Sequence, residues 1–238
     1  MKIRIKFRKW GVMKFVGHLD IMRYFQKAIR RANIDICYSE GFSPHQIMSF
    51  AAPLGVGITS DGEYFDIEVN STMPSRDAIA ALNATMVDGI EVTGYVQLPD
   101  NAKTAMAIVA AADYELSFKE DYAPLCSYEK AIEMVARFKE APSFLIEKQT
   151  KKSTREVDLK PLVYEISVKE QQNRPVFFLK ISTGSIQNLK PELVLSSLLA
   201  TEQIAYDENA VAIHRLEVYA QDDMQNFQSL LDMGQEIA

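Results

Sequence analysis

The sequence contains few residues of the kinds that build metal centres and disulfide frameworks. Its 238 residues include only two cysteines, Cys37 and Cys126, and three histidines, His18, His45 and His214. Two cysteines are too few for a disulfide framework, a Cys-rich zinc site or a self-contained iron–sulfur cluster. We therefore expect no metal site and no cofactor in this chain.

Long apolar runs are also missing. No stretch approaches the roughly 20 apolar residues that a bilayer span requires. The first ten residues, MKIRIKFRKW, alternate charged and apolar side chains, whereas a signal peptide has a continuous apolar segment. With 47% hydrophobic and 24% charged residues the composition is that of a globular protein, and we expect a cytoplasmic protein without membrane contact.

Charge is distributed unevenly along the chain, although the net charge is −6. Residues 1–60 contain ten Lys and Arg against three Asp and Glu, which is +7, so the remaining 178 residues carry −13. Such an asymmetry in an acidic protein indicates that one surface meets a polyanion while the rest keeps the molecule soluble.

The hydrophobic periodicity of the first hundred residues predicts the order βαββαβ. Strict alternation favours strands, and spacings of three and four residues favour helices. On this basis we expect strands over 2–8, 47–51, 63–70 and 90–96, and helices over 18–33 and 76–86.

The second half repeats this order. We expect strands over 107–118, 143–149, 162–169, 176–182 and 212–219, and helices over 127–139 and 191–200. The fold class is therefore α+β, as two tandem ferredoxin-like units with antiparallel sheets. The predicted division is 1–100, 101–220 and an acidic tail, 221–238, which either docks as a helix or frays.

The helix predicted over 18–33 is amphipathic. Its apolar residues form one stripe that we expect to face a core, namely Ile21, Phe25, Ala28, Ile29 and Ala32. Four cations repeat the same spacing shifted by two residues, which places them on the opposite side: Arg23, Lys27, Arg30 and Arg31. Cations presented in this way are typical of contacts with a phosphate backbone.

A loop follows this helix and combines hydroxyls, a glycine, an imidazole and aromatic rings: Tyr38, Ser39, Gly41, Phe42, Ser43, Pro44 and His45. Such a loop can bind phosphate through backbone amides and hydroxyls, or stack a base on Phe or Tyr. The alternative is a rigid turn in which Phe42 plugs the core.

Four residues are candidates for catalysis: His18, Asp20, His45 and Asp66. His18 could act as a base or phosphate donor, or be an ordinary surface group, and Asp20 could cap the helix. Asp66 shares a strand face with Glu68, which suits either an acid pair for magnesium or proton transfer, or a solvated strand face. Catalysis would require these side chains, with Glu63, to converge in one pocket.

A second basic cluster lies in the segment EKQTKKSTREVDLKP, where Lys151, Lys152 and Arg155 stand among threonines and a serine. Its composition matches phosphate-backbone contacts, although taken alone it is more typical of a solvated connection between two strands. Together with the basic helix it favours RNA binding.

Several segments resemble the radical SAM-linked protein family, a bacterial domain of unknown function found beside, or fused behind, a radical SAM protein. The matching segments are residues 17–23 (GHLDIMR), 28–32 (AIRRA), 38–45 (YSEGFSPH), 50–54 (FAAPL), 62–66 (GEYFD) and 154–161 (TREVDLKP). The resemblance implies a partner, a radical SAM protein encoded nearby, and a genomic neighbourhood of ribonuclease and ribosomal genes. Because this chain lacks three clustered cysteines, radical chemistry would reside in the partner.

Three hypotheses follow. The first is a non-catalytic accessory protein that binds tRNA or rRNA, or presents a substrate to a separate radical SAM enzyme. The second is an enzyme that modifies RNA or a nucleotide with His18, Asp20, His45 and Asp66. The third is a pure protein-interaction module whose basic helix binds an acidic partner.

Overall fold

The computed structural model describes residues 1–149, 154–184 and 187–238, and the chain forms two compact units. Unit 1 comprises residues 1–111 and 215–238, and unit 2 comprises residues 112–214. The chain passes between them within the strands β5 (Val109–Phe118) and β10 (Val211–Gln221). The α+β class predicted from the sequence is confirmed, and the finer assignment to tandem ferredoxin-like units stays a prediction.

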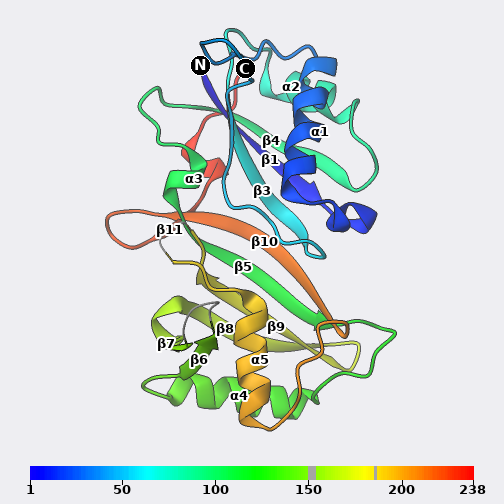
Figure 1. The fold of residues 1–238 in the computed structure, drawn as a ribbon, viewed down its shortest axis with the longest axis vertical. Helices are drawn as coiled ribbons and strands as arrows, with labels where there is room; N and C mark the ends of the chain where they lie inside the picture. The colour runs from blue at the N-terminus through cyan, green and yellow to red at the C-terminus, as the bar shows by residue number, and fades with distance from the viewer. Residues whose placement is uncertain (150–153, 185–186) are drawn as a thin grey trace. The chain divides into compact units, whose positions relative to one another are not determined.

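Unit 1 is built on an antiparallel sheet in which β1 (Lys2–Lys9) lies between β4 (Ile90–Leu98) and β3 (Thr59–Glu68). The short β2 (Met48–Phe50) pairs with β3. The helices α1 (His18–Arg31) and α2 (Ser75–Asn83) follow β1 and β3 in the chain (Figure 1). The sequence therefore predicted the order of these elements correctly.

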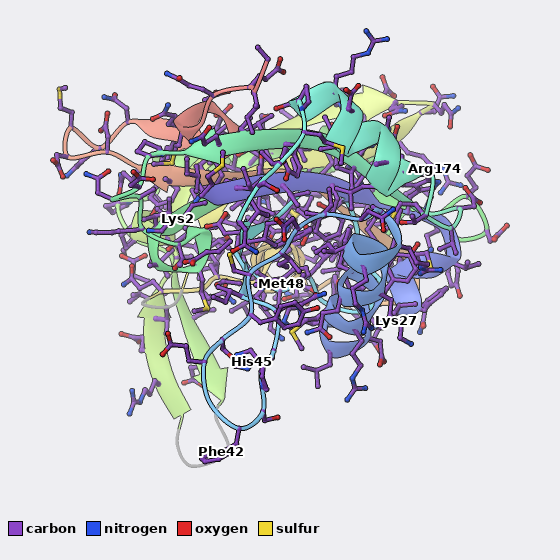
Figure 2. The ribbon with its side chains drawn as sticks, turned by 90° about the horizontal axis from the view of Figure 1, so that it is seen from above. Lys2, Lys27, Phe42, His45, Met48 and Arg174 are labelled. Carbon is purple, nitrogen blue, oxygen red and sulfur yellow. The ribbon has the colours of Figure 1, made fainter. Side chains whose placement is uncertain are left out.

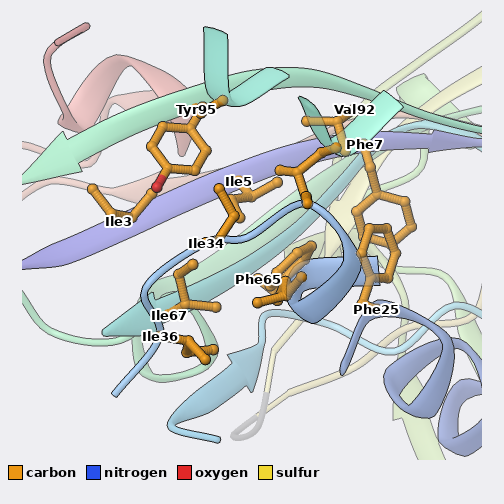
Figure 3. Packing of buried hydrophobic residues seen from close by; sticks show 14 of the residues in the cluster. Ile3, Ile5, Phe7, Phe25, Ile34, Ile36, Phe65, Ile67, Val92 and Tyr95 are labelled. Carbon is orange, nitrogen blue, oxygen red and sulfur yellow. The ribbon is translucent and has the colours of Figure 1, made fainter. Parts of the chain in front are cut away.

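One face of this sheet packs against α1. Ile3, Ile5 and Phe7 alternate along β1 and meet the apolar stripe of α1, where the Phe7 and Phe25 rings lie edge to face at 4.7 Å (Figure 3). Fully burying each such side chain contributes about 1.5–3 kcal/mol. This packing fixes the direction in which the polar side of α1 faces.

The other face of the sheet is covered by the C-terminal residues. A 3-10 turn, η3 (Leu231–Met233), follows β11 (Phe227–Ser229), and Gln235 exchanges two backbone hydrogen bonds with Gln97 of β4. A Cβ added at Gly94 would lie 2.6 Å from the Leu231 side chain, which shows how closely this segment lies on the sheet. The segment expected as a separate acidic tail thus belongs to unit 1, and it forms a strand and a turn where we expected a helix or a frayed end.

In unit 2 the sheet strands follow the order β5, β9 (Arg174–Ser182) and β8 (Val163–Gln171), and the first residues of β10 lie beside β5. Its helices are α4 (Tyr128–Glu140), capped by the Ser127 hydroxyl, and α5 (Pro191–Thr201), which begins with proline as expected. A separate hairpin joins β6 (Leu145–Gln149) to β7 (Thr154–Asp158), and the turn η2 (Lys160–Leu162) leads into β8.

Three elements differ from the sequence prediction, and one of them is β3, which begins at Thr59 where we expected a strand from residue 63. The strand expected from residue 107 starts at Val109, because residues 105–108 form the short helix α3 (Ala105–Ile108). The segment expected as a connection between strands contains β7, whose exposed polar residues hid its strand character. Within the described residues, no helix is both long and apolar enough to span a bilayer.

Candidate functional site on unit 1

The polar side of α1 is an exposed cationic surface. Arg23, Lys27, Arg30 and Arg31 are all exposed, whereas Ile21, Phe25, Ala28 and Ile29 are buried, as the spacing predicted (Figure 2 labels Lys27). Arg23 contacts the Asp20 carboxylate at 3.2 Å. Lys27, Arg30 and Arg31 form no ion pair with any described residue, so their charges are available to a ligand. We call these four cations the α1 basic face.

The Tyr38–His45 loop projects from unit 1 as a closed turn. The backbone N–H of Ser39 donates to the His45 carbonyl at 2.8 Å, and the Ser39 hydroxyl lies 2.8 Å from Nδ1 of His45. Gly41 adopts φ +105°, a conformation that favours glycine, at the tip of this turn. The tip is thereby held in shape by contacts at its base.

Phe42 stands at the tip of the loop and is fully exposed (Figure 2). The alternative in which Phe42 plugs the core is therefore wrong. Tyr38 and His45 are exposed as well, while Ser39 is half-buried. A fully exposed phenylalanine has no packing role, which leaves its ring free to stack on a ligand.

The loop is attached to α1. Tyr38 and Gln46 form a β-bridge at its base, and Nε2 of the buried Gln46 donates to the Gln26 carbonyl of α1 at 3.2 Å. Because Gln26 adjoins Lys27 in the helix, this hydrogen bond ties the loop base to the neighbourhood of the α1 basic face. Cations and an exposed aromatic ring thus occur on linked elements of the same unit.

Asp66 is occupied by a buried ion pair. Its carboxylate accepts hydrogen bonds from Nε and Nη2 of Arg4 at 2.8 and 3.0 Å, and from the backbone N–H of Ala105 at 2.6 Å. Arg4 is completely buried and also donates to the Leu230 carbonyl. The suggestion of a solvated strand face is therefore wrong for Asp66. Its carboxylate links β3 to β1 and α3, and Arg4 in turn contacts the C-terminal segment.

Glu63 belongs to a second buried ion pair. Arg215 donates to it from Nε at 2.8 Å and from Nη2 at 2.5 and 2.6 Å, and Nη2 also donates to the Ala52 carbonyl. Both side chains are buried, so Glu63 is a structural partner of Arg215 inside unit 1.

A small cavity adjoins this second pair and contains His18 and Lys9. Burial lowers the pKa of Lys9 below its ordinary value, although the charge of Glu63 opposes this. Burial likewise lowers the pKa of His18, whose ring meets Phe50 edge to face at 5.1 Å. The cavity has a volume of about 10 Å³, and the residues that line it are Phe7, Lys9, His18, Ile21, Phe50, Pro53, Leu54 and Glu63.

The four catalytic candidates have separate surroundings. His18 lines the cavity, Asp20 is exposed beside Arg23, His45 bonds to Ser39, and Asp66 is held by Arg4. No hydrogen bond or ion pair between described residues joins any two of the four. Nor does the described part of the chain hold three His, Cys, Asp or Glu side chains in a cluster suited to a metal ion.

The second basic cluster lies in unit 2. Lys151 and Lys152 fall outside the described residues, while Arg155 is exposed in β7. The register places Arg155 opposite Lys148 across the β6–β7 hairpin.

Sequence reasoning missed Arg4, Lys9 and Arg215. The alternation of β1 indicated that its basic residues lie on an outer face, and nothing local shows that the C-terminal segment covers Arg4. One available signal was the charge pattern of two strands: the chain places three carboxylates, Asp61, Glu63 and Asp66, in one strand next to a strand rich in cations.

Comparison with known proteins gives a family but no activity. Residues 2–191 match the model of a family described as "Uncharacterized protein conserved in bacteria (DUF2344)". No match is found among curated proteins.

Two solved structures align with this chain, each with a TM-score below 0.5. A chain in the "Crystal Structure of a Cbf5-Nop10-Gar1 Complex" matches 93% of this chain at 11% identity with a TM-score of 0.49, and this chain spans about half (50%) of its length. The "Crystal Structure of an Unknown Protein from Galdieria sulphuraria" matches 90% of this chain and 96% of that chain at 12% identity, with a TM-score of 0.23.

Proposed function

The chain belongs to the bacterial DUF2344 family, and we propose that within it this protein binds single-stranded RNA through the α1 basic face and the Tyr38–His45 loop. We further propose that it is a non-catalytic accessory protein, which presents the bound RNA to a separate radical SAM enzyme. The observation that carries the proposal is the exposure of Lys27, Arg30 and Arg31 without ion-pair partners among the described residues, beside a loop with a fully exposed Phe42.

The cations of α1 suit a phosphate backbone. Arg23 and Arg31 are eight residues apart, which corresponds to about 12 Å along the helix axis. Guanidinium groups bind phosphate oxygens with two parallel hydrogen bonds, and each neutralised phosphate releases counterions. A row of cations of this length contacts several consecutive phosphates without reading their sequence.

The loop suggests single-stranded rather than duplex RNA. Stacking of an unpaired base on an aromatic side chain contributes about 1–3 kcal/mol, and it requires a base that is not already stacked in a helix. Phe42 and Tyr38 offer such rings, and the Gln46–Gln26 hydrogen bond ties the base of their loop to α1. Lys151, Lys152 and Arg155 of unit 2 would add further phosphate contacts.

The proposals of an accessory role and of a radical SAM partner are inferred from the sequence. The resemblance to radical SAM-linked proteins implies a nearby radical SAM protein, and two cysteines cannot hold the cluster that such chemistry needs. The separate surroundings of His18, Asp20, His45 and Asp66 favour this role over catalysis by those four residues.

Filter binding to bulk tRNA and rRNA fragments at low salt tests the proposal. We expect the wild-type protein to bind, and the double variant Arg30→Glu/Arg31→Glu to lose most of its affinity because two attractive contacts become repulsive. The matched control is Arg76→Glu/Lys103→Glu, which makes the same change in net charge at two exposed residues of unit 1 outside α1.

Retention of affinity in the control and loss in the α1 variant support the proposal. Equal loss in both variants would mean that binding depends on net charge alone. If the wild-type protein does not bind RNA at low salt, the α1 basic face is instead a docking surface for an acidic protein.

A further inference from the structure

Lys9 is buried without a carboxylate of its own. Lys9 is only 3% exposed. Its ammonium forms one hydrogen bond with the described residues, a long one of 3.4 Å to the Val16 carbonyl. The nearby Glu63 is engaged through both oxygens by Arg215. Two cationic side chains therefore share one buried carboxylate, which leaves one positive charge uncompensated.

An uncompensated buried ammonium is costly. Unit 1 contains two other buried cationic side chains, Arg4 and Arg215, and each has a carboxylate partner. Lys9 departs from this pattern, and a cavity adjoins its buried charge. A negatively charged group in the cavity would supply the missing partner.

His18 provides a second donor at the same cavity. It is half-buried, its ring lies against Phe50, and the ring nitrogens form no hydrogen bond with the described residues. A histidine that packs on an aromatic ring while both nitrogens remain unbonded is able to bond a ligand.

The dimensions of the cavity restrict the ligand. A volume of about 10 Å³ admits one group of the size of a water molecule or an oxygen atom. The walls are mainly apolar, and Pro53 is exposed beside the half-buried Leu54. A carboxylate can insert one oxygen toward Lys9 and His18 and leave its carbon chain against the apolar rim, whereas inorganic phosphate has no carbon chain to contact that rim.

We propose that the cavity lined by Lys9 and His18 is a binding site for the carboxylate group of a small organic acid. The Lys9 ammonium and the His18 ring would bond its oxygens, and the apolar residues Phe50, Pro53 and Leu54 would contact its carbon chain. The site is independent of the proposed RNA surface, because none of its residues belongs to the α1 basic face or to the Tyr38–His45 loop.

Titration of the protein with acetate, followed by NMR of the histidine rings, tests this site. The chain has three histidines, so His18 reports on the cavity while His45 and His214 report on general salt effects. The His18→Gln variant identifies the signal of His18. At constant ionic strength we expect a saturable shift of the His18 signal with acetate, and no saturable shift of the other two.

Replacement of Lys9 decides the assignment. We expect acetate affinity to fall at least tenfold in Lys9→Met and in Lys9→Gln, and to be unchanged in the matched variant Lys14→Met. Lys9→Met should unfold at the same or a higher temperature than wild type, since it removes a buried charge. The site is refuted if His18 shows no saturable shift, if Lys9→Met and Lys9→Gln bind acetate as wild type does, or if phosphate saturates the shift and acetate does not.

Discussion

Replacing Asp66 with asparagine should destabilise unit 1 strongly, because the carboxylate is a buried structural group. It accepts three hydrogen bonds, two from Arg4 and one from the backbone N–H of Ala105. Asparagine has the same shape but no charge, and its amide NH2 would face one of these donors. The variant would leave the fully buried Arg4 without a counter-charge.

The expected cost follows from this geometry. Removing one partner of a buried ion pair costs about 3–5 kcal/mol, because the remaining charge stays desolvated. In a protein of this length each kcal/mol shifts the melting temperature by about 2–4 °C. We therefore expect Asp66→Asn to melt about 10 °C below wild type.

Thermal and urea unfolding followed by circular dichroism measure this loss. The double variant Arg4→Met/Asp66→Leu is the informative comparison, since it removes both charges and replaces them with apolar side chains of similar size. We expect it to be more stable than Asp66→Asn alone. If Asp66→Asn lies within about 1 kcal/mol of wild type, the ion pair does not hold the C-terminal segment on the sheet, and the reasoning is wrong.

Three further predictions concern unit 1. Phe42→Ala should leave the melting temperature unchanged and weaken binding of a single-stranded RNA by about 1–3 kcal/mol, with little change for a duplex; equal effects on both would contradict base stacking. The lowered pKa of His18 means that the folded protein binds fewer protons there than the unfolded chain, so this group should reduce stability as the pH falls from 7 through 6.5, and His18→Gln should remove that part of the pH dependence measured by urea unfolding. Gly62→Ala should lower the midpoint of urea unfolding, since the added Cβ would lie 2.7 Å from the Glu217 backbone; an unchanged midpoint would show that β10 can move away.

Local patterns in the sequence predicted α1 well. The periodicity of Ile21, Phe25 and Ile29 against Arg23, Lys27 and Arg30 is a property of the helix alone, and the structure confirms both faces. The α+β class followed from the same kind of pattern.

The buried ion pairs could not be predicted in this way. Arg4 and Asp66 are 62 residues apart, and Glu63 and Arg215 are 152 residues apart. Whether these side chains are buried depends on which distant segment covers the sheet. The hydrophobic periodicity of a strand does not show which segment that is. The same holds for the cavity at Lys9, which forms where β1, β3, α1 and residues 50–54 pack together.

The salt dependence of single-stranded RNA binding tests the central claim most directly. If the four cations of the α1 basic face each neutralise one phosphate, the logarithm of the binding constant should fall with the logarithm of salt concentration with a slope of about −3. In Arg30→Glu/Arg31→Glu the slope should become shallower, with a magnitude of about 1.4 or smaller. Arg76→Glu/Lys103→Glu should keep the wild-type slope. Equal slopes for the wild type and the Arg30→Glu/Arg31→Glu variant would contradict RNA binding by α1.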